Sequence, residues 1–347
     1  MIKINDRLIS KEHPPYIIAE ISANHNGNLQ NALKLIELSA EAGADAVKIQ
    51  TYRPNTITLN GDTSDFLITD GQWKGRTLWD LYDWAHTPWE WHARLFSHAK
   101  DVGITLFSSP FDPSAVVLLE ELGTPAYKVA SFEIVDLPLI RCIASKRKPM
   151  IISTGMASLD EIEQAVEAVQ EEGCADLVLL HCVSGYPAPA EEYNLKTLSD
   201  IATRFNTVVG LSDHTLDNSV AIASVALGAA VIEKHVTLDR LGGGPDDSFS
   251  LEPAELEDLC KGTRKAWEAL GKIDYSRKSS ELENVKFRRS LYFVKDLKSG
   301  DVVTEDAIRS VRPGYGLAPK WHPSIIGKKV NLDIKKYTPV SFDLLDL

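Results

Sequence analysis

Two lysines of this 347-residue chain lie inside short apolar segments, where a charged side chain needs a specific partner. Lys48 occurs in AVKIQ and Lys128 in AYKVAS. Burial of an unpaired ammonium group is costly, because the protein interior does not replace its hydration. One interpretation is a structural ion pair with Glu20, Glu133 or Glu233. The other is a cradle for an anion, because ammonium groups bind phosphate and carboxylate oxygens.

Serines at the ends of neighbouring apolar segments favour the anion cradle. Their hydroxyl groups also suit phosphate and carboxylate oxygens. The serines at this level are Ser109, Ser131, Ser153 and Ser212. Glu20 lies near the end of a further segment, and Glu133 follows the segment that contains Lys128. Each would serve either as a general acid or base or as a partner of a lysine.

Two histidines, His214 and His235, end apolar segments that follow one another along the chain. Adjacent strands of a sheet lie about 4.8 Å apart, so the two imidazoles would converge on one point. Two imidazoles with open positions beside them suit a divalent transition metal. The alternative is that each is a hydrogen-bonded structural histidine, because this spacing matches no specific metal motif.

A regular alternation of apolar runs and longer amphipathic segments positions these residues. It predicts strands at 16–22, 44–51, 104–109, 126–130, 149–154, 177–183, 207–211 and 229–235. It predicts helices at 29–42, 89–102, 114–122, 137–145, 159–172, 195–205, 219–227 and 254–270. Eight strand–helix units favour an α/β fold, a (β/α)₈ TIM barrel over residues 1–270, with a doubly wound open sheet as the alternative. In such barrels the active site lies at the carboxyl ends of the strands, which is where these polar residues occur.

The pattern changes after residue 270. Residues 271–286 are polar and indicate a linker, and residues 287–347 form short strand-like segments with tight turns. We expect a small β-rich domain that docks on a barrel, because domains of this size are marginally stable alone. The glycine-rich stretch from Gly242 to Asp247 would be either a cover that places Asp246 on a substrate or a plain connector.

Composition narrows the class of protein. Hydrophobic residues make up 44% and charged residues 25%, which is typical of a globular protein. The net charge of −12 argues against binding to nucleic acid or an anionic membrane. The most apolar stretch, residues 220–232, is too short to span a membrane, and the polar start does not resemble a secretory signal. The four cysteines contain no CxxC pair, so we expect reduced thiols in the cytoplasm.

Several motifs together resemble the sialic acid synthase family in order and spacing. They are AEISANHNG, ADAVKIQTY, FSSPFD, AYKVASFE, ISTGMA, GLSDHT and VIEKHVTLD. The C-terminal RRSLY, KDLKSGD and SVRPGYGLAPK resemble the antifreeze-like (SAF) domain of that family. TPWEWH, SFEIVDLPLI and DSFSLEP are more similar to the pseudaminic acid synthases than to the N-acetylneuraminate enzymes.

The resemblance implies a transferase that condenses phosphoenolpyruvate with an N-acetylated amino sugar and releases phosphate by C–O cleavage. For the pseudaminic acid group the sugar is 2,4-diacetamido-2,4,6-trideoxy-altrose and the product is pseudaminic acid. It also implies a divalent metal, Mn²⁺ first with Mg²⁺ or Co²⁺ as alternatives. It implies a domain-swapped homodimer in which the SAF domain of one chain caps the barrel of the other.

The resemblance also assigns roles to individual residues. It assigns phosphoenolpyruvate to Lys48, Ser109, Lys128, Ser131, Ser153 and Ser212. It makes His214 and His235 the metal ligands, with Glu20 orienting or deprotonating metal-bound water. It assigns the sugar to Gln50, Glu133, Tyr186 and Asp246, with Phe287 and Arg312 contributed by the partner chain. Ser184 departs from the asparagine usual in N-acetylneuraminate enzymes, which puts one phosphoenolpyruvate contact in doubt.

Three rival functions stay open at this point. A neuraminate or legionaminate synthase would differ only in the sugar. A metal-dependent aldolase would use the same ring of residues without phosphoenolpyruvate. A carbohydrate- or ice-binding module without catalysis would need no buried lysines in a barrel, so the polar strand ends argue against it.

Overall fold

The computed structural model of the chain describes residues 1–71 and 73–346. These residues form two compact units, the first being Met1–Gly271 and the second beginning at Lys272. Leu347, the last residue of the predicted C-terminal domain, lies outside the described residues.

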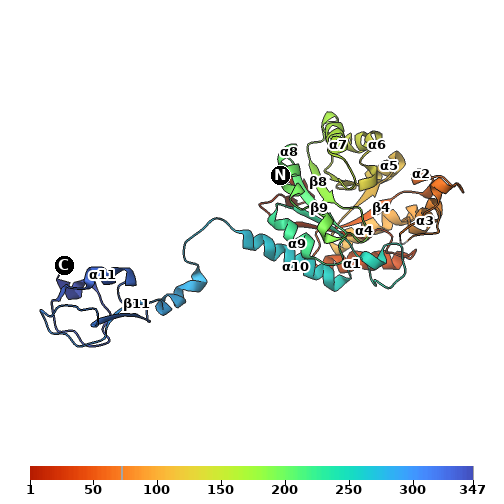
Figure 1. The fold of residues 1–347 in the computed structure, drawn as a ribbon. Helices are drawn as coiled ribbons and strands as arrows, with labels where there is room; N and C mark the ends of the chain where they lie inside the picture. Colours follow the sequence, from red (N-terminus) through yellow and green to blue (C-terminus); the bar gives the residue numbers. More distant parts are fainter. Residues whose placement is uncertain (72, 347) are drawn as a thin grey trace. The chain divides into compact units, whose positions relative to one another are not determined.

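The first unit is a closed barrel of eight parallel strands (Figure 1). Around the barrel the order is β10-β3-β4-β5-β6-β7-β8-β9. The strands are β3 (Tyr16–Glu20), β4 (Ala46–Thr51), β5 (Thr105–Pro110), β6 (Tyr127–Val129), β7 (Met150–Ser153), β8 (Leu177–Cys182), β9 (Val208–Asp213) and β10 (Val231–His235). Pairing of β10 with both β3 and β9 closes the ring, so the (β/α)₈ prediction is confirmed and the open sheet is excluded.

Helices connect the strands and cover the outside of the barrel. They are α1 (Leu29–Glu41), α4 (His92–Val102), α5 (Pro113–Glu121), α6 (Leu137–Ala144), α7 (Leu159–Glu171), α8 (Thr197–Phe205), α9 (Ser219–Ala226) and α10 (Pro253–Leu270). Local chemistry fixes their ends. At α7 the Ser158 side chain accepts from Glu161 N, and at α4 Gly103 ends the helix with φ 85°, which a residue without Cβ adopts freely.

The hydrophobic core lies between the strands and these helices, with Ile36, Leu119, Ile140 and Leu259 fully buried on the helix side. A second cluster closes the amino end of the barrel. There an N-terminal hairpin, β1 (Ile2–Ile4) and β2 (Arg7–Ile9), packs its isoleucines on the lower residues of the strands. The opposite, carboxyl end is therefore the open one.

Short elements occur in the connections at the open end. Between β4 and α4 lie α2 (Pro54–Ile57), η1 (Ser64–Phe66), α3 (Leu78–Ala85) and η2 (Trp89–Trp91). Later connections contain η3 (Ser131–Glu133), η4 (Ala190–Glu192) and η5 (Asp247–Phe249). The predicted helix at 89–102 is thus divided into η2 and α4.

The second unit is small and rich in short strands. Its elements are η6 (Ser279–Phe287), β11 (Ser290–Phe293), β12 (Ile308–Val311), η7 (Pro319–Trp321), α11 (His322–Ile325), β13 (Lys329–Val330), η8 (Phe342–Leu344) and β14 (Leu345–Asp346). β11 pairs with β12 and β13 with β14, both antiparallel. A core of its own, including Leu291, Phe293 and Val340, holds them together. Among the described residues of both units, no helix has the length and apolar character needed to cross a membrane.

Candidate active site

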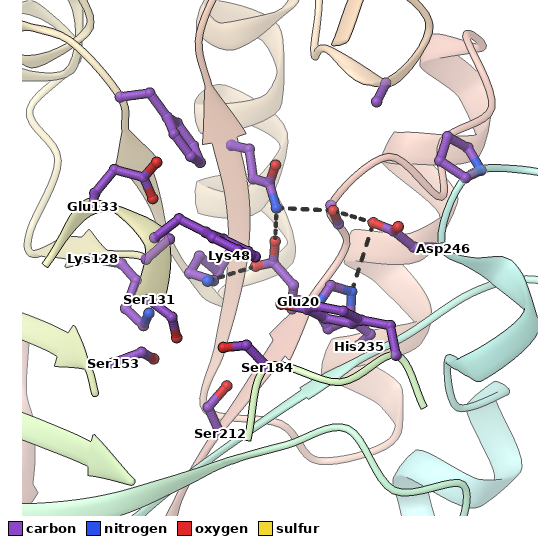
Figure 2. Close-up of a pocket in the computed structure, with 18 of the residues that line it drawn as sticks. Glu20, Lys48, Lys128, Ser131, Glu133, Ser153, Ser184, Ser212, His235 and Asp246 are labelled. Atoms are coloured by element: carbon purple, nitrogen blue, oxygen red, sulfur yellow. Dashed lines mark hydrogen bonds and ion pairs between the residues drawn. The ribbon is translucent and has the colours of Figure 1, made fainter. Parts of the chain in front are cut away.

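A cavity of about 350 Å³ opens at the carboxyl end of the barrel, where seven of the eight strands or the turns after them contribute polar side chains (Figure 2). Strand register sets its geometry. Glu20 of β3 lies level with Lys48 of β4 and with His235 of β10. The register of the parallel strands therefore brings these side chains together at the cavity.

The two lysines lie on the floor of this cavity, 4% and 1% exposed. Lys48 Nζ is 3.0 Å from Glu233 Oε1 and 3.2 Å from Glu20 Oε2. Lys128 Nζ donates to the Val129 carbonyl at 2.9 Å and lies 3.9 Å from Glu233 Oε1. Lys48 thus has two carboxylate partners at short range, whereas Lys128 has one, and that one is distant.

The charges of this cluster shift one another's pKa values. Burial alone would lower the pKa of Lys48, but the carboxylates of Glu20 and Glu233 raise it above the ordinary lysine value. Burial raises the pKa of Glu20, and its like-charged neighbour Glu233 adds to that effect against the opposing Lys48. The two lysines hold the pKa of Glu233 below its usual range in spite of burial. Burial also lowers the pKa of Lys128 to about 8, with Glu233 opposing.

Serine hydroxyls surround the lysines. Ser153 is 2% exposed, and its Oγ has no hydrogen-bond partner among the described residues. Ser131 Oγ contacts Cys182 Sγ at 3.5 Å, and Ser212 Oγ contacts Glu233 Oε1 at 3.4 Å, both long contacts. A buried hydroxyl without a partner is rare in proteins, so this layer has donors to spare for a ligand.

A chain of hydrogen bonds runs along one wall from Glu20 to Asp246 (Figure 2). Gln50 Nε2 donates to Glu20 Oε1 at 3.0 Å and to Ser22 Oγ at 2.9 Å. Ser22 Oγ in turn donates to Asp246 Oδ2 at 2.6 Å. Ser22 takes a left-handed backbone, φ 47°, which is rare outside glycine and turns its hydroxyl between these groups. Burial raises the pKa of Asp246 to about 6.

The two histidines face each other across β9 and β10, with ring centroids 5.5 Å apart. His214 Nδ1 lies 2.8 Å from the Val183 carbonyl, so Nδ1 carries the proton and Nε2 keeps its lone pair. His235 Nδ1 is buried, has no hydrogen-bond partner among the described residues and lies 4.0 Å from Asp246 Oδ2. The Tyr186 ring lies against both imidazoles, with centroids at 4.4 and 6.3 Å.

Comparison with known proteins places this geometry in a family. The model of the NeuB family matches residues 35–275, and the model of the SAF domain matches residues 288–346. The chain belongs to the NeuB family. It is therefore an enzyme of the sialic-acid-type synthase group, built as a TIM-like barrel followed by a SAF domain.

Individual relatives of this NeuB-family enzyme are similar along nearly the whole chain. It is 45% identical to pseudaminic acid synthase of Campylobacter jejuni, over 92% of this chain and 93% of that one. It is 40% identical to pseudaminic acid synthase of Helicobacter pylori, over 95% and 97%. The crystal structure of N-acetylneuraminic acid synthetase from Leptospira borgpetersenii, in complex with citrate, matches with a TM-score of 0.73 at 31% identity, over 83% of this chain and 95% of that one.

The structure of this NeuB-family enzyme brings most of the predicted site residues to one cavity. Those that line it are Glu20, Lys48, Gln50, Lys128, Ser131, Glu133, Ser153, Tyr186, Ser212, His214, His235 and Asp246. Ser109 lies beside Lys48, whose Nζ donates to its hydroxyl at 3.5 Å, rather than on the cavity wall. Phe287 ends η6 and Arg312 follows β12, both in the second unit, so neither lies in the unit that contains the cavity.

Other lining residues were not among the assigned site residues, although the sequence had offered Glu233 as an ion-pair partner of the lysines and Ser184 as an altered phosphoenolpyruvate contact. Glu233 bridges the two lysines, and its position two residues before His235 is the signal that it faces the same way. Ser22 and Ser184 follow strand ends in the same manner. Aromatic and aliphatic residues from α3 gave no such signal, because nothing in their pattern separates a cavity wall from ordinary helix packing.

The imidazole pair fits a divalent cation. The lone pair of His214 Nε2 and the buried His235 Nδ1, which has no hydrogen-bond partner among the described residues, are ligand atoms of the right kind. The bond to the Val183 carbonyl fixes the His214 tautomer, as a backbone carbonyl commonly does for a metal-binding histidine. The described residues contain no cluster of three or more metal-ligating side chains, so protein atoms alone would leave coordination positions open.

Proposed function

We propose that this enzyme condenses phosphoenolpyruvate with 2,4-diacetamido-2,4,6-trideoxy-altrose and water to give pseudaminic acid and phosphate. The observation that supports the proposal is the composition of one cavity, which is lined by two buried lysines, a serine hydroxyl without a hydrogen-bond partner among the described residues, and a pair of histidines. The pseudaminic acid synthases among its relatives supply the choice of sugar.

The floor would bind the carboxylate and phosphate of phosphoenolpyruvate. Lys128 is the more available cation, because its nearest carboxylate oxygen is 3.9 Å away. Ser153, Ser131 and Ser212 would add hydrogen bonds to the anion. Fixing both substrates in one cavity turns a bimolecular encounter into a reaction between aligned groups.

The condensation forms one carbon–carbon bond and breaks one carbon–oxygen bond. C3 of phosphoenolpyruvate attacks the aldehyde carbon of the open-chain sugar, whose oxygen takes up a proton and becomes a hydroxyl. Water adds at C2 and gives up one proton. The C2–O bond to phosphate then breaks as the new C2 hydroxyl becomes the ketone and passes its proton to the leaving phosphate. Glu20 suits the water proton, because burial keeps its carboxyl pKa raised and Gln50 orients its Oε1.

His214 and His235 would hold a divalent metal, and Mn²⁺, Mg²⁺ and Co²⁺ are the candidates. Such a cation supplies Lewis acidity toward a carbonyl oxygen when bound. The proposal also includes a cytoplasmic, domain-swapped homodimer in which the SAF domain of one chain, with Phe287 and Arg312, covers the barrel of the other. The Phe287 side chain is 52% exposed within its own unit, which is consistent with such an arrangement.

The test is phosphate release from phosphoenolpyruvate in the presence of Mn²⁺ with three sugars in parallel. These are 2,4-diacetamido-2,4,6-trideoxy-altrose, N-acetylmannosamine and 2,4-diacetamido-2,4,6-trideoxy-mannose. Release with the altrose sugar alone supports the proposal. Release with another sugar keeps the reaction and corrects the substrate to a neuraminate or legionaminate precursor, and release with none contradicts the reaction.

A further inference from the structure

The cavity has layers of different chemistry along β4. Lys48, Gln50 and Tyr52 are alternate residues of this strand and its end, and all three line the cavity. Each step of two residues rises about 7 Å. Lys48 therefore lies on the floor, Gln50 at mid-height and Tyr52 at the mouth, because the carboxyl end of the barrel is the open one.

The upper layer is an apolar wall. Tyr52 packs edge to face on Phe111 and Tyr82, with ring centroids 5.1 and 5.8 Å apart. Aliphatic side chains complete the surface, of which Leu81 is only 7% exposed. The wall consists of Tyr52, Ile57, Leu81, Tyr82, Ala85 and Phe111.

Two anchors fix the connection that carries this wall over the barrel. The Trp73 indole Nε1 donates to the Pro245 carbonyl at 2.9 Å, which joins the β4–α4 connection to the loop after β10. The Arg53 guanidinium lies over the Trp89 ring, 4.0 Å from its centroid. The first contact thus joins the connection to a neighbouring loop, and the second joins its two ends to each other, which together hold the wall at the cavity.

Polar groups of the cavity come from the lower layers and, in the wall, from the hydroxyls of Tyr52 and Tyr82. Gln50, Glu133 and Asp246 supply acceptors and a donor in the lower layers. The aliphatic part of the wall has none. A hydroxyl held against Leu81, Ile57 and Ala85 would lose its water without gaining a partner, whereas a methyl group would fit.

We infer that the apolar wall selects a sugar whose end remote from the aldehyde is a methyl group instead of a hydroxymethyl group, and that Leu81 determines this specificity with Ile57. The inference rests on the proposed function, because the aldehyde must lie near phosphoenolpyruvate on the floor. The far end of an extended six-carbon chain then reaches the upper layer.

The test uses two sugars that differ only at C6, namely 2,4-diacetamido-2,4,6-trideoxy-altrose and its 6-hydroxy counterpart. We expect the wild-type enzyme to prefer the deoxy sugar by about 10- to 100-fold in kcat/KM, the range that an apolar pocket achieves for one small group. Leu81→Asn should reduce that preference to below about 3-fold through the KM of the sugar, with the KM of phosphoenolpyruvate unchanged. Leu81→Met, an apolar change of similar volume, should keep it.

Ile57→Thr, at a half-buried position, provides a second variant in case Leu81→Asn does not fold. Equal kcat/KM for the two sugars in the wild-type enzyme overturns the inference, and so does a preference retained in every folded polar variant. Calorimetric binding of the two sugars separates this failure from failure of the reaction. Tighter binding of the deoxy sugar without phosphate release would support the wall and contradict the condensation.

Discussion

The two floor lysines differ in how free they are to bind a ligand. Lys48 Nζ forms ion pairs with two buried carboxylates, 3.0 Å from Glu233 and 3.2 Å from Glu20. Lys128 Nζ donates to a backbone carbonyl and lies 3.9 Å from Glu233 Oε1. Sequence reasoning left a structural ion pair and an anion cradle as alternatives for both residues. The structure gives Lys48 the ion pair and leaves Lys128 as the side chain with unused hydrogen-bonding capacity.

Replacement of Lys128 by Met should therefore act mainly on ligand binding. We expect the KM for phosphoenolpyruvate to rise about 10- to 100-fold, the effect of one charge-assisted hydrogen bond, while the melting temperature does not fall. Steady-state kinetics and calorimetry measure the two quantities. An unchanged KM would contradict the role of Lys128 in the cradle.

Lys48→Met is the matched comparison. It leaves Glu20 and Glu233 buried without their cation, which should lower the free energy of unfolding by about 3–5 kcal/mol. Urea unfolding measures this loss. If the Lys48 and Lys128 variants proved equally stable, the difference in pairing would not govern the cluster.

Glu133 predicts a pH-dependent stability. Burial raises the pKa of its carboxyl to about 7, against the opposing charge of Lys128 and with a smaller contribution from Asp136. The folded state therefore binds the proton more tightly than the unfolded state, and the resulting stability is lost as pH rises from about 4.5 through 7. Glu133→Gln removes this loss. The melting temperature of the variant minus that of the wild type should therefore be about 2–5 °C larger at pH 8 than at pH 5.

Scanning calorimetry at both pH values checks the effect. Glu167→Gln, a change of the same kind on the exposed face of α7, serves as the control. Its melting temperature should differ from that of the wild type by the same amount at pH 5 and at pH 8. A constant offset for Glu133→Gln would show that the buried carboxyl does not titrate in this range.

At the level of elements, the regular alternation of short and long segments made the barrel predictable. The predicted and observed ends of the barrel strands agree within a few residues. This is because buried parallel strands are continuous apolar runs, with polar residues only where the strands leave the sheet. The short hairpin β1–β2 and helices α2 and α3 were not predicted. Their segments are too short or too mixed in composition to show a period of two or 3.6 residues.

The turn after β7 gives a prediction at this scale. A Cβ added to Gly155 would overlap the Ser184 hydroxyl and lie 2.8 Å from Ser131 Oγ. Both contacts are ends of side chains that can rotate, so Gly155→Ala should fold but displace two hydroxyls of the cavity. We expect the KM for phosphoenolpyruvate to rise about 10-fold or more, as misplaced positioning groups do.

Gly185→Ala is the control for this change, because its added Cβ would meet atoms no closer than 3.5 Å, an ordinary contact. Steady-state kinetics of both variants measure the KM for phosphoenolpyruvate, and melting curves check that both variants fold. Equal kinetics for the two variants would mean that Gly155 is not needed to seat the serines.

At the level of the whole molecule, the barrel and the SAF domain are separate compact units, each with its own core. The sequence indicated this division through the polar stretch after residue 270. It also identified nearly every residue on the cavity floor, since those residues sit in conspicuous places within apolar runs. It did not reveal the apolar wall, because Leu81 and Ile57 look like any residues that pack in a core.

The proposed domain swap predicts complementation between two inactive chains. One carries Arg312→Ala and the other Lys128→Met, and each alone should have low activity at a phosphoenolpyruvate concentration near or below the wild-type KM. If the SAF domain serves the partner's barrel, a refolded equal mixture should recover about a quarter of wild-type activity, because half the dimers are mixed and each has one intact site. Activity no higher than the average of the two parents would place each site within a single chain.

The buried lysine floor also determines how an anion reaches it. The chain as a whole carries a charge of −12, so its outer surface repels phosphoenolpyruvate but not a neutral sugar. At physiological ionic strength the Debye length is about 8 Å, which confines that repulsion to a thin layer. The attraction of the lysines is confined in the same way and acts only once the anion has entered the barrel mouth. If phosphoenolpyruvate is the substrate, its capture is thus a short-range event, and the proposed preference for a triply charged substrate would arise from retention rather than from long-range steering.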